Sequence, residues 1–295
     1  RQQPLTLPDE LRADTRRLFC GREVERRQCV EVLAATSADR PFGWVWILGE
    51  PGIGKTRLAA EVADAAHRRG DRVLFGRNSE DLKVPYQPFI EVIRQAFGQS
   101  TADVPPGLAP LLPETGDLAG GGPHGGSTGR SESATDSETQ RYRLFEAIAE
   151  WLTDCAADRP VTMIIDDVHW ATDSTLQLLG HLQRRQSEAA VTLVLTARDT
   201  APDSNPRVAD LLAAGQGGDH SVVVRLGGLS GDDARRLVGQ GMDLDEIMRQ
   251  TAGNPLLLQA VDPDDGSVDM PSAVHRRLAS LDKEVQETLR LVSVL

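Results

Sequence analysis

A glycine-rich segment that ends in a lysine and a threonine has the spacing of a phosphate-binding loop. Residues 49–56 read GEPGIGKT, which fits the pattern G-x-x-x-x-G-K-S/T. An apolar run at residues 44–48 precedes the segment, and a helical pattern follows it. Glycines let backbone N–H groups turn toward bound phosphates, and a helix N-terminus adds the positive end of its dipole. The segment therefore predicts a binding site for a nucleoside triphosphate.

The side chains of this loop have separate predicted roles. We expect Lys55 to reach the β- and γ-phosphates and the Thr56 hydroxyl to ligate Mg²⁺. The other predicted nucleotide contacts come from neighbouring residues, namely Glu50, Pro51, Gly52, Ile53, Gly54 and Arg57. The alternative is a glycine-rich turn with an accidental lysine, which the flanking strand and helix patterns disfavour.

Two carboxylates end a second apolar run. Residues 161–165 read VTMII, and Asp166 and Asp167 follow directly. In a parallel sheet covered on both faces, strands are continuous apolar runs and ligands bind beyond their carboxyl ends. We expect Asp166 to hold Mg²⁺, directly or through water, and Asp167 to orient or polarise the attacking water. Capping of a following helix is the alternative use of the pair, which a phosphate loop earlier in the chain disfavours.

Apolar runs and helical patterns alternate along the chain and indicate the elements that must position these residues. The strand-like runs are residues 44–48, 72–76, 161–166, 191–197 and 221–226. The helical patterns are residues 23–35, 55–69, 87–97, 139–157, 172–185 and 206–214. This alternation predicts βαβ units, and hence an α/β fold with a parallel sheet covered by helices on both faces.

Segments outside this alternation divide the chain into domains. Residues 1–18 have mixed charge and no clear period, which predicts a linker or arm, and residues 19–226 form the predicted nucleotide-binding domain. Within that domain, residues 99–137 are rich in glycine, serine and threonine, which predicts a flexible insertion. A lid that orders on binding is the alternative for this segment. Short helical patterns then predict a helical lid domain over residues 227–265, and they cover residues 230–240, 243–251 and 255–260.

Composition argues against several classes of protein. The 295 residues carry a net charge of −12, which disfavours a nucleic-acid surface built from clustered Lys and Arg. Aromatic residues make up 4% of the chain, too few for base-stacking platforms. The three cysteines, Cys20, Cys29 and Cys155, lack metal-ligand spacing and predict reduced thiols in a cytoplasmic protein. No apolar stretch is long enough to cross a membrane, and the chain starts and stops as a fragment of a longer protein would.

Several motifs, spread over nearly all of the chain, resemble the STAND class of signal-transducing P-loop ATPases. The nearest resemblance is to the ATPase module of large bacterial transcription regulators, those of the LuxR type and those of actinomycete antibiotic pathways. Besides the phosphate loop, the motifs are FCGRE at 19–23, VPYQPF at 84–89, DDVHWA at 166–171, TARD at 196–199, LGGLS at 226–230 and GNP at 253–255.

The resemblance implies further site residues. It implies that Arg22 lies against the adenine, that Arg198 faces the γ-phosphate and that Pro255 packs on the base. Each has a plain structural alternative: a surface or capping role for Arg22, an ion pair for Arg198, and a helix stop and restart around Pro255. One departure from the family is Thr172, because members usually carry an acidic residue directly after His-Trp-Ala.

The predicted fold is thus an α/β P-loop NTPase, followed by a small helical domain and, at residues 266–295, the start of a winged-helix domain. The predicted function is an ATP- or ADP-binding, slowly hydrolysing, Mg²⁺-dependent switch of a transcription regulator, in which Lys55, Asp167 and Arg198 promote hydrolysis. The implied partners are further copies of the chain, in a nucleotide-dependent assembly, and DNA, through domains outside this fragment. The alternatives are the same module serving another effector, such as a nucleotide cyclase or a protein kinase, and a metabolic P-loop kinase.

Overall fold

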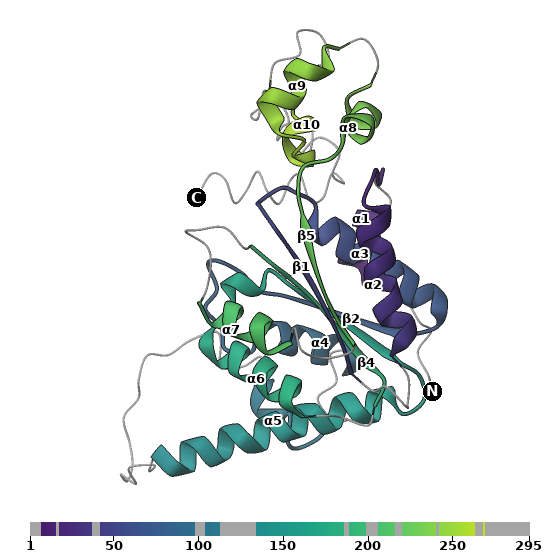
Figure 1. The fold of residues 1–295 in the computed structure, drawn as a ribbon. Coiled ribbons are helices and arrows are strands. Elements are labelled where there is room, and N and C mark those ends of the chain that lie inside the picture. Colours follow the sequence, from purple (N-terminus) through teal and green to yellow (C-terminus); the bar gives the residue numbers. More distant parts are fainter. Residues whose placement is uncertain are drawn as a thin grey trace, which may run out of the picture.

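The computed structural model places a small helical domain above one edge of a three-layer α/β domain (Figure 1). It describes residues 7–15, 18–36, 42–97, 104–112, 134–185, 189–198, 206–215, 220–239, 242–262 and 268. Within these residues, no helix is both long enough and apolar enough to span a membrane. The three cysteines are free thiols, and all are buried.

A five-stranded parallel sheet forms the middle layer. Its strands are β1 (Phe42–Gly49), β2 (Arg72–Arg77), β3 (Val161–Asp166), β4 (Val191–Ala197) and β5 (Ser221–Leu226), in the spatial order β2-β3-β4-β1-β5. Every pairing in the sheet is parallel. Because β4 lies between β1 and β3, its carboxyl end lies between the strand ends that carry the phosphate loop and the acid pair. The predicted α/β fold with a parallel sheet is confirmed.

Helices cover both faces of this sheet. One face carries α1 (Asp9–Thr15), α2 (Glu23–Ala35) and α3 (Lys55–Arg69). The other face carries α4 (Gln87–Phe97), α5 (Ala134–Ala156), α6 (Asp173–Arg184) and α7 (Pro206–Gly215). Since the side chains of a strand alternate between the faces, β1 feeds both layers. Its Trp44, Trp46 and Leu48 join the α4–α7 core, and its Val45 and Ile47 join the α1–α3 core.

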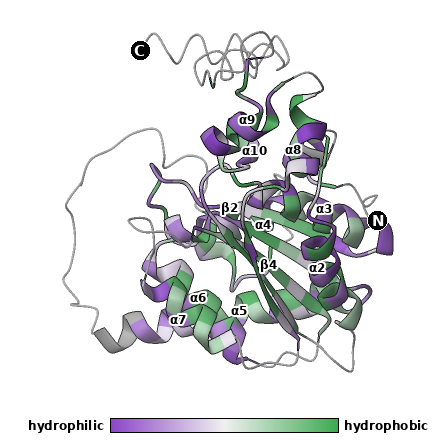
Figure 2. Cartoon of the chain, turned by 45° about the horizontal axis from the view of Figure 1, so that its top comes forward, coloured by the Kyte–Doolittle hydropathy of each residue, from purple (hydrophilic) through white to green (hydrophobic). Residues whose placement is uncertain are grey.

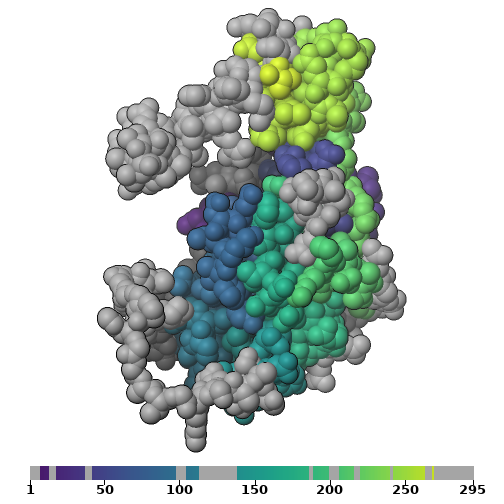
Figure 3. Space-filling model, turned by 90° about the vertical axis from the view of Figure 1, so that its left-hand side faces the viewer, coloured from purple at the N-terminus to yellow at the C-terminus, as the bar shows by residue number. Residues whose placement is uncertain are grey.

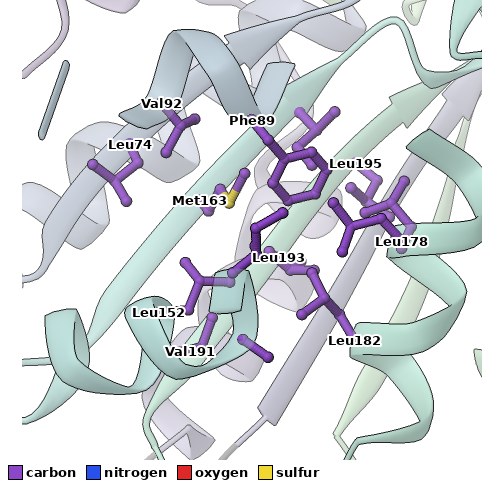
Figure 4. Packing of buried hydrophobic residues seen from close by; sticks show 14 of the residues in the cluster. Leu74, Phe89, Val92, Leu152, Met163, Leu178, Leu182, Val191, Leu193 and Leu195 are labelled. Carbon is purple, nitrogen blue, oxygen red and sulfur yellow. The ribbon is translucent and has the colours of Figure 1, made fainter. Parts of the chain in front are cut away.

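The larger core lies under α4, α5 and α6. Figure 4 shows Leu193 and Leu195 of β4 and Met163 of β3 among side chains from these helices, including Phe89 and Leu152. Strands β3 and β4 are buried on both faces along their whole length, and green segments of the sheet in Figure 2 mark its apolar residues. Burial of this kind fixes the strands rigidly, so the loops at their carboxyl ends start from defined positions.

Two segments without a predicted fold contribute to the cores. Residues 9–15 of the predicted arm form α1, and Leu11 of this helix is fully buried in the α1–α3 core. In the predicted insertion, Leu108 and Leu111 are buried in the other core, and α5 begins at Ala134. The apolar residues of α1 and of residues 104–112 stand in stretches too short to show a period, so they gave no signal. Residues 99–103 and 113–133 lie outside the described residues.

The small helical domain has a core of its own. It consists of α8 (Gly231–Val238), α9 (Leu244–Thr251) and α10 (Pro255–Leu258). Their shared core is formed by Leu229, Ala234, Ile247, Leu258 and Val261. Figure 3 shows this domain, in yellow-green, resting on the indigo segment that contains the residues near 50. Of the predicted winged-helix start at residues 266–295, the structure describes only Val268, which forms a β-bridge with Val261.

Candidate functional site

The phosphate loop connects β1 to α3 at the edge of the sheet that faces the small helical domain. Its Gly54 is the N-cap of α3 and has φ 102°, a backbone conformation that residues with a Cβ rarely adopt. The loop therefore turns sharply and leads directly into a helix N-terminus. Ile53 of the loop is 3% exposed and packs in the α1–α3 core, so its contribution to the site is limited to its backbone.

The ammonium group of Lys55 lies inside the loop. Its Nζ donates to the carbonyl oxygens of Gly49 and Glu50, both at 2.9 Å, and the residue is 7% exposed. These carbonyls are neutral acceptors, whereas a phosphate oxygen carries charge and makes the stronger, charge-assisted bond. Lys55 is thus already aimed into the loop that would surround phosphates.

Asp166 is the most heavily bonded side chain of the site. It is fully buried at the end of β3, and the Thr56 hydroxyl lies 3.1 Å from both of its oxygens. The Thr196 hydroxyl donates to Oδ1 at 2.5 Å. Arg77 donates to Oδ2 from Nε at 3.0 Å and from Nη2 at 2.8 Å. The structure therefore brings together Thr56 and Asp166, the two residues predicted to hold Mg²⁺.

Asp167 combines a strained backbone conformation with surroundings that disfavour its negative charge. Its φ of 56° places it in the left-handed region, where residues other than glycine are uncommon. Burial, followed by the negative charge of Asp166, raises the pKa of Asp167 to about 6, against the opposing charges of Arg77, Lys55 and Arg198. Strained residues with perturbed pKa values concentrate at functional sites. Asp167 has both properties, at the edge where ligands bind.

Thr196 and Arg77 belong to the site although the sequence analysis assigned neither of them to it. Thr196 connects the two acids, because its hydroxyl donates to Asp166 and accepts from the Asp167 N–H at 2.9 Å. Arg77 ends β2 directly beside Asp166 in the register of β2 and β3. The only signal for Arg77 was a cation at the end of an apolar strand. Thr196 lies in the TARD motif, but its position between the acids follows from the strand order.

Arg198 lies near the acids, one residue beyond β4. Its guanidinium stands over the ring of Trp170 at 5.3 Å, and the Lys83 ammonium is 5.4 Å from the same ring. The backbone N–H of Arg198 donates to Nδ1 of His169 at 3.4 Å. Thr172, the departure from the family pattern, caps α6 by accepting the N–H of Thr175.

Three segments that meet at the phosphate loop supply Arg22 and Pro255, the two predicted contacts to the base, and Arg57, a predicted contact to the nucleotide. Arg22 donates to the carbonyl of Gly227, just after β5, and pairs with Glu25 at 3.2 Å. Arg57 pairs with Glu61 at 2.7 Å, and its guanidinium lies over the Phe19 ring at 4.9 Å.

Pro255, the second predicted contact to the base, is the first residue of α10. Its neighbour Asn254 donates to the Pro51 carbonyl at 3.0 Å. The motif at residues 19–23, the phosphate loop and the motif at 253–255 thus lie around one place.

The sequence matches the AAA ATPase domain family over residues 18–195. The chain belongs to this family. The match includes the phosphate loop and both acids, and it ends one residue before Thr196. A search of curated proteins found no match.

Solved structures that are similar to this AAA ATPase chain include three from different organisms. They are Cdc6p from Pyrobaculum aerophilum (TM-score 0.46, 15% identity, 92% of this chain and 62% of that one), Drosophila ORC bound to DNA (0.43, 14%, 92% and 58%) and a mutant of RuvB from Thermotoga maritima (0.40, 11%, 93% and 71%). The chain spans about three fifths of the length of the first two.

Membership of the AAA ATPase family implies nucleotide binding, typically with Mg²⁺, and the residues present fit that ion. Mg²⁺ prefers oxygen ligands, and at nucleotide sites one or two protein groups join the phosphates and water. The Thr56 hydroxyl and the Asp166 carboxylate supply oxygens side by side. Among the described residues, His, Cys, Asp and Glu form no group of three or more that could hold a metal. The donor set thus suits an ion that is shared with a nucleotide.

A separate pocket lies in the AAA ATPase domain, away from the carboxyl edge of the sheet. Its volume is about 850 Å³, and it lies between α5, α6 and α7. The lining includes Tyr142, Phe145, Arg184 and Arg207 and contains none of the predicted site residues. The predicted site residues are therefore gathered at the carboxyl edge of the sheet rather than in the pocket.

Proposed function

We propose that this chain is an ATP-operated switch within a transcription regulator, and that it hydrolyses ATP slowly. The observation that carries the proposal is the meeting of three features at one edge of the sheet. These are the phosphate loop with Lys55 inside it, the Thr56–Asp166 oxygen pair, and Asp167 with its raised pKa. Phosphoryl transfer to water needs positioning and charge neutralisation, and this set of groups offers both.

In this proposal, Lys55 exchanges the carbonyls of Gly49 and Glu50 for oxygens of the β- and γ-phosphates. Mg²⁺, held by Thr56 and Asp166, supplies positive charge to the phosphates when it is bound. Asp167 orients the attacking water and accepts its proton, because a base whose pKa lies near the working pH is effective in both tasks. Thr196 holds the two acids at a fixed distance, through one hydroxyl that bonds to both residues.

Arg198 is the proposed source of discrimination between ATP and ADP. A nucleotide shifts a conformational equilibrium only through contacts that differ between the two states. A γ-phosphate would draw the Arg198 guanidinium away from the Trp170 face, where it lies at 5.3 Å, and ADP would not. Arg22 and Pro255 are the proposed contacts to adenine.

The proposed output of the switch is assembly of several copies of the chain in the ATP-bound state. DNA would be contacted through domains outside residues 1–295, which agrees with the net charge of −12 on this part. The resemblance in the motifs supports the regulatory role, and membership of the AAA ATPase family supports the nucleotide chemistry.

Nucleotide binding by the purified chain tests this proposal. ATP or ADP at a hundredfold excess over its dissociation constant should stabilise the fold by about 2.7 kcal/mol, and GTP should do so less. Mass analysis of nucleotide carried through purification gives the resting state, and sizing with ATP or ADP gives the assembly. An equal thermal shift with GTP would contradict adenine recognition, and identical sizes with both adenine nucleotides would contradict the switch.

A further inference from the structure

The small helical domain is hydrogen-bonded directly to the phosphate loop. Nδ2 of Asn254 donates to the Pro51 carbonyl at 3.0 Å, and the Leu256 N–H donates to the Gly52 carbonyl at 3.3 Å. Asn254 is 203 positions away from Pro51 in sequence, so these bonds join two separate parts of the fold. Figure 3 shows the close approach of the two parts.

The side chain of Asn254 makes two hydrogen bonds, one as an acceptor and one as a donor. Its Oδ1 accepts the Leu256 N–H at 3.0 Å, which caps α10, while its Nδ2 donates to the loop. An amide has one acceptor end and one donor end, so it can satisfy both partners at once. A carboxylate or a hydroxyl at this position would keep the cap, which Asp and Ser also provide. The bond to the loop is therefore what specifically requires asparagine.

Gly52 is required on the other side of the contact. A Cβ at Gly52 would lie 2.7 Å from Cβ of Leu256 and 3.0 Å from Oδ1 of Asn254. These distances are shorter than ordinary van der Waals contact, so the small helical domain can approach only a glycine here. The absence of a side chain in the loop thus serves the docking of this domain as well as the approach of phosphate.

The bonds to Pro51 and Gly52 complete the set of acceptors along the first half of the loop. Lys55 occupies the carbonyls of Gly49 and Glu50, and the small helical domain occupies the next two. In a planar trans peptide, the carbonyl and the following N–H point in opposite directions. Holding the Pro51 carbonyl toward α10 therefore turns the Gly52 N–H away from it, and backbone N–H groups of such loops are the ones that bind phosphate.

We propose that Asn254 is a positioning residue that sets the orientation of the phosphate-loop backbone and couples nucleotide occupancy to the small helical domain. This inference rests on the proposed nucleotide binding. Coupling between two parts is reciprocal, so a docked domain raises nucleotide affinity and a bound nucleotide holds the domain in place. Asn254 acts through the loop backbone, in contrast to Lys55, which would contact phosphate itself.

Two substitutions separate the bond to the loop from the cap. Asn254→Asp keeps an acceptor for the Leu256 N–H but faces Pro51 with an oxygen, and Asn254→Ser keeps a cap but is too short to reach the loop. Both should weaken ADP binding by about three- to tenfold in calorimetric titration, the range of one neutral hydrogen bond. The control is Asp243→Ala, which removes the N-cap of α9 in the same domain and should leave ADP affinity within about twofold.

Hydrogen exchange supplies the readout that a merely structural role would not change. In the wild-type chain, ADP should slow exchange both in the phosphate loop and across residues 244–260. In both Asn254 variants at saturating ADP, the loop should remain protected while the added protection of 244–260 is lost. Unchanged ADP affinity together with wild-type protection of 244–260 would overturn the role of Asn254. Failure of the wild-type chain to bind ADP would instead contradict the proposed function.

Discussion

The two edges of the sheet each carry a buried aspartate, and the two aspartates are held differently. At the edge where the strands begin, Asp71 precedes β2 and is 1% exposed. Nε and Nη2 of Arg69 donate to its two oxygens at 2.8 and 2.6 Å, and the Thr162 hydroxyl donates to it at 2.8 Å. One guanidinium thus serves both carboxylate oxygens, which is the strongest geometry for this pair. The arrangement is closed and needs no further partner.

At the edge where the strands end, Asp166 has an arrangement that can change partners. Arg77 gives both of its bonds to a single oxygen, from a side chain that is 47% exposed. The Thr56 hydroxyl shares both oxygens, and a second carboxylate, Asp167, follows in a strained conformation. The same residue types therefore form a structural ion pair at one edge and the proposed ligand site at the other. The difference lies in the geometry of the arginine and in the second acid.

The largest expected effect is a loss of stability at the edge where the strands begin, without a loss of nucleotide binding at the other edge. Asp71→Ala should lower the free energy of unfolding by about 2–4 kcal/mol, because it leaves Arg69 without its buried partner. Nucleotide affinity, measured well below the melting temperature, should stay within about twofold. Chemical denaturation and titration of the same sample check both statements, with Asp64→Ala, which removes the partly exposed ion pair with Arg68 on α3, as the control. A large loss of ADP affinity in Asp71→Ala would show that the edges are not independent.

The second prediction concerns the phosphate loop at the carboxyl edge. Lys55→Ala should weaken ADP binding by about 1.5–3 kcal/mol, roughly ten- to a hundredfold, which is the scale of a charge-assisted contact. Arg68→Ala, at the far end of the same helix, is the matched control. If calorimetric titration shows that Lys55→Ala binds ADP with unchanged affinity, the phosphate loop is not the nucleotide-binding site.

The third prediction uses the raised pKa of Asp167. Because the pKa in the folded chain, about 6, exceeds the ordinary value of 3.8, the proton is held more tightly in the fold. This contribution to stability is complete below pH 3.8 and is lost as the pH rises through about 6. The free energy of unfolding of Asp167→Asn should therefore match that of the wild type at low pH.

Above pH 6.5, Asp167→Asn should be more stable than the wild type by about 1–2 kcal/mol, a range reduced for the partial exposure of the carboxylate. Urea unfolding at several pH values, without nucleotide or Mg²⁺, measures the difference. A difference that does not change with pH would mean that the pKa of Asp167 is not raised.

The smallest expected effect concerns Arg198. Arg198→Ala should leave ADP affinity within about twofold and weaken ATP binding severalfold, because only ATP offers the γ-phosphate. Titration with both nucleotides, together with sizing of any ATP-driven assembly, checks this. Equal losses for the two nucleotides would make Arg198 a structural residue.

Much of the fold could be predicted because its strands are unusually uniform. The runs that became β3, β4 and β5 have the predicted bounds. Strands β3 and β4 are buried along their whole length and leave few polar residues to obscure the pattern, and β5, although half-buried, has a central run of three valines. The phosphate loop is a local motif, so its position followed from sequence alone. Helix α1 could not be predicted, because its seven residues make only about two turns, too few to show a repeating apolar face.

The rest of the site depends on contacts that are distant in sequence. Thr196 resembles Thr192 and Thr162 in its strand context, and only the strand order places it against both acids. Arg77 reaches Asp166 from 89 positions away, through the pairing of β2 with β3. Local sequence motifs predict the two acids, but they cannot predict the distant residues that hold the acids in place.

Phosphate release from ATP by the wild-type chain and by Asp167→Asn tests the central claim most directly. With Mg²⁺ present, the wild type should release phosphate slowly. Asp167→Asn should bind ATP with similar affinity and release almost none, because the substitution keeps the shape and removes the base. Phosphate release from Asp167→Asn at the wild-type rate would contradict the assignment of this edge of the sheet as the site of ATP hydrolysis.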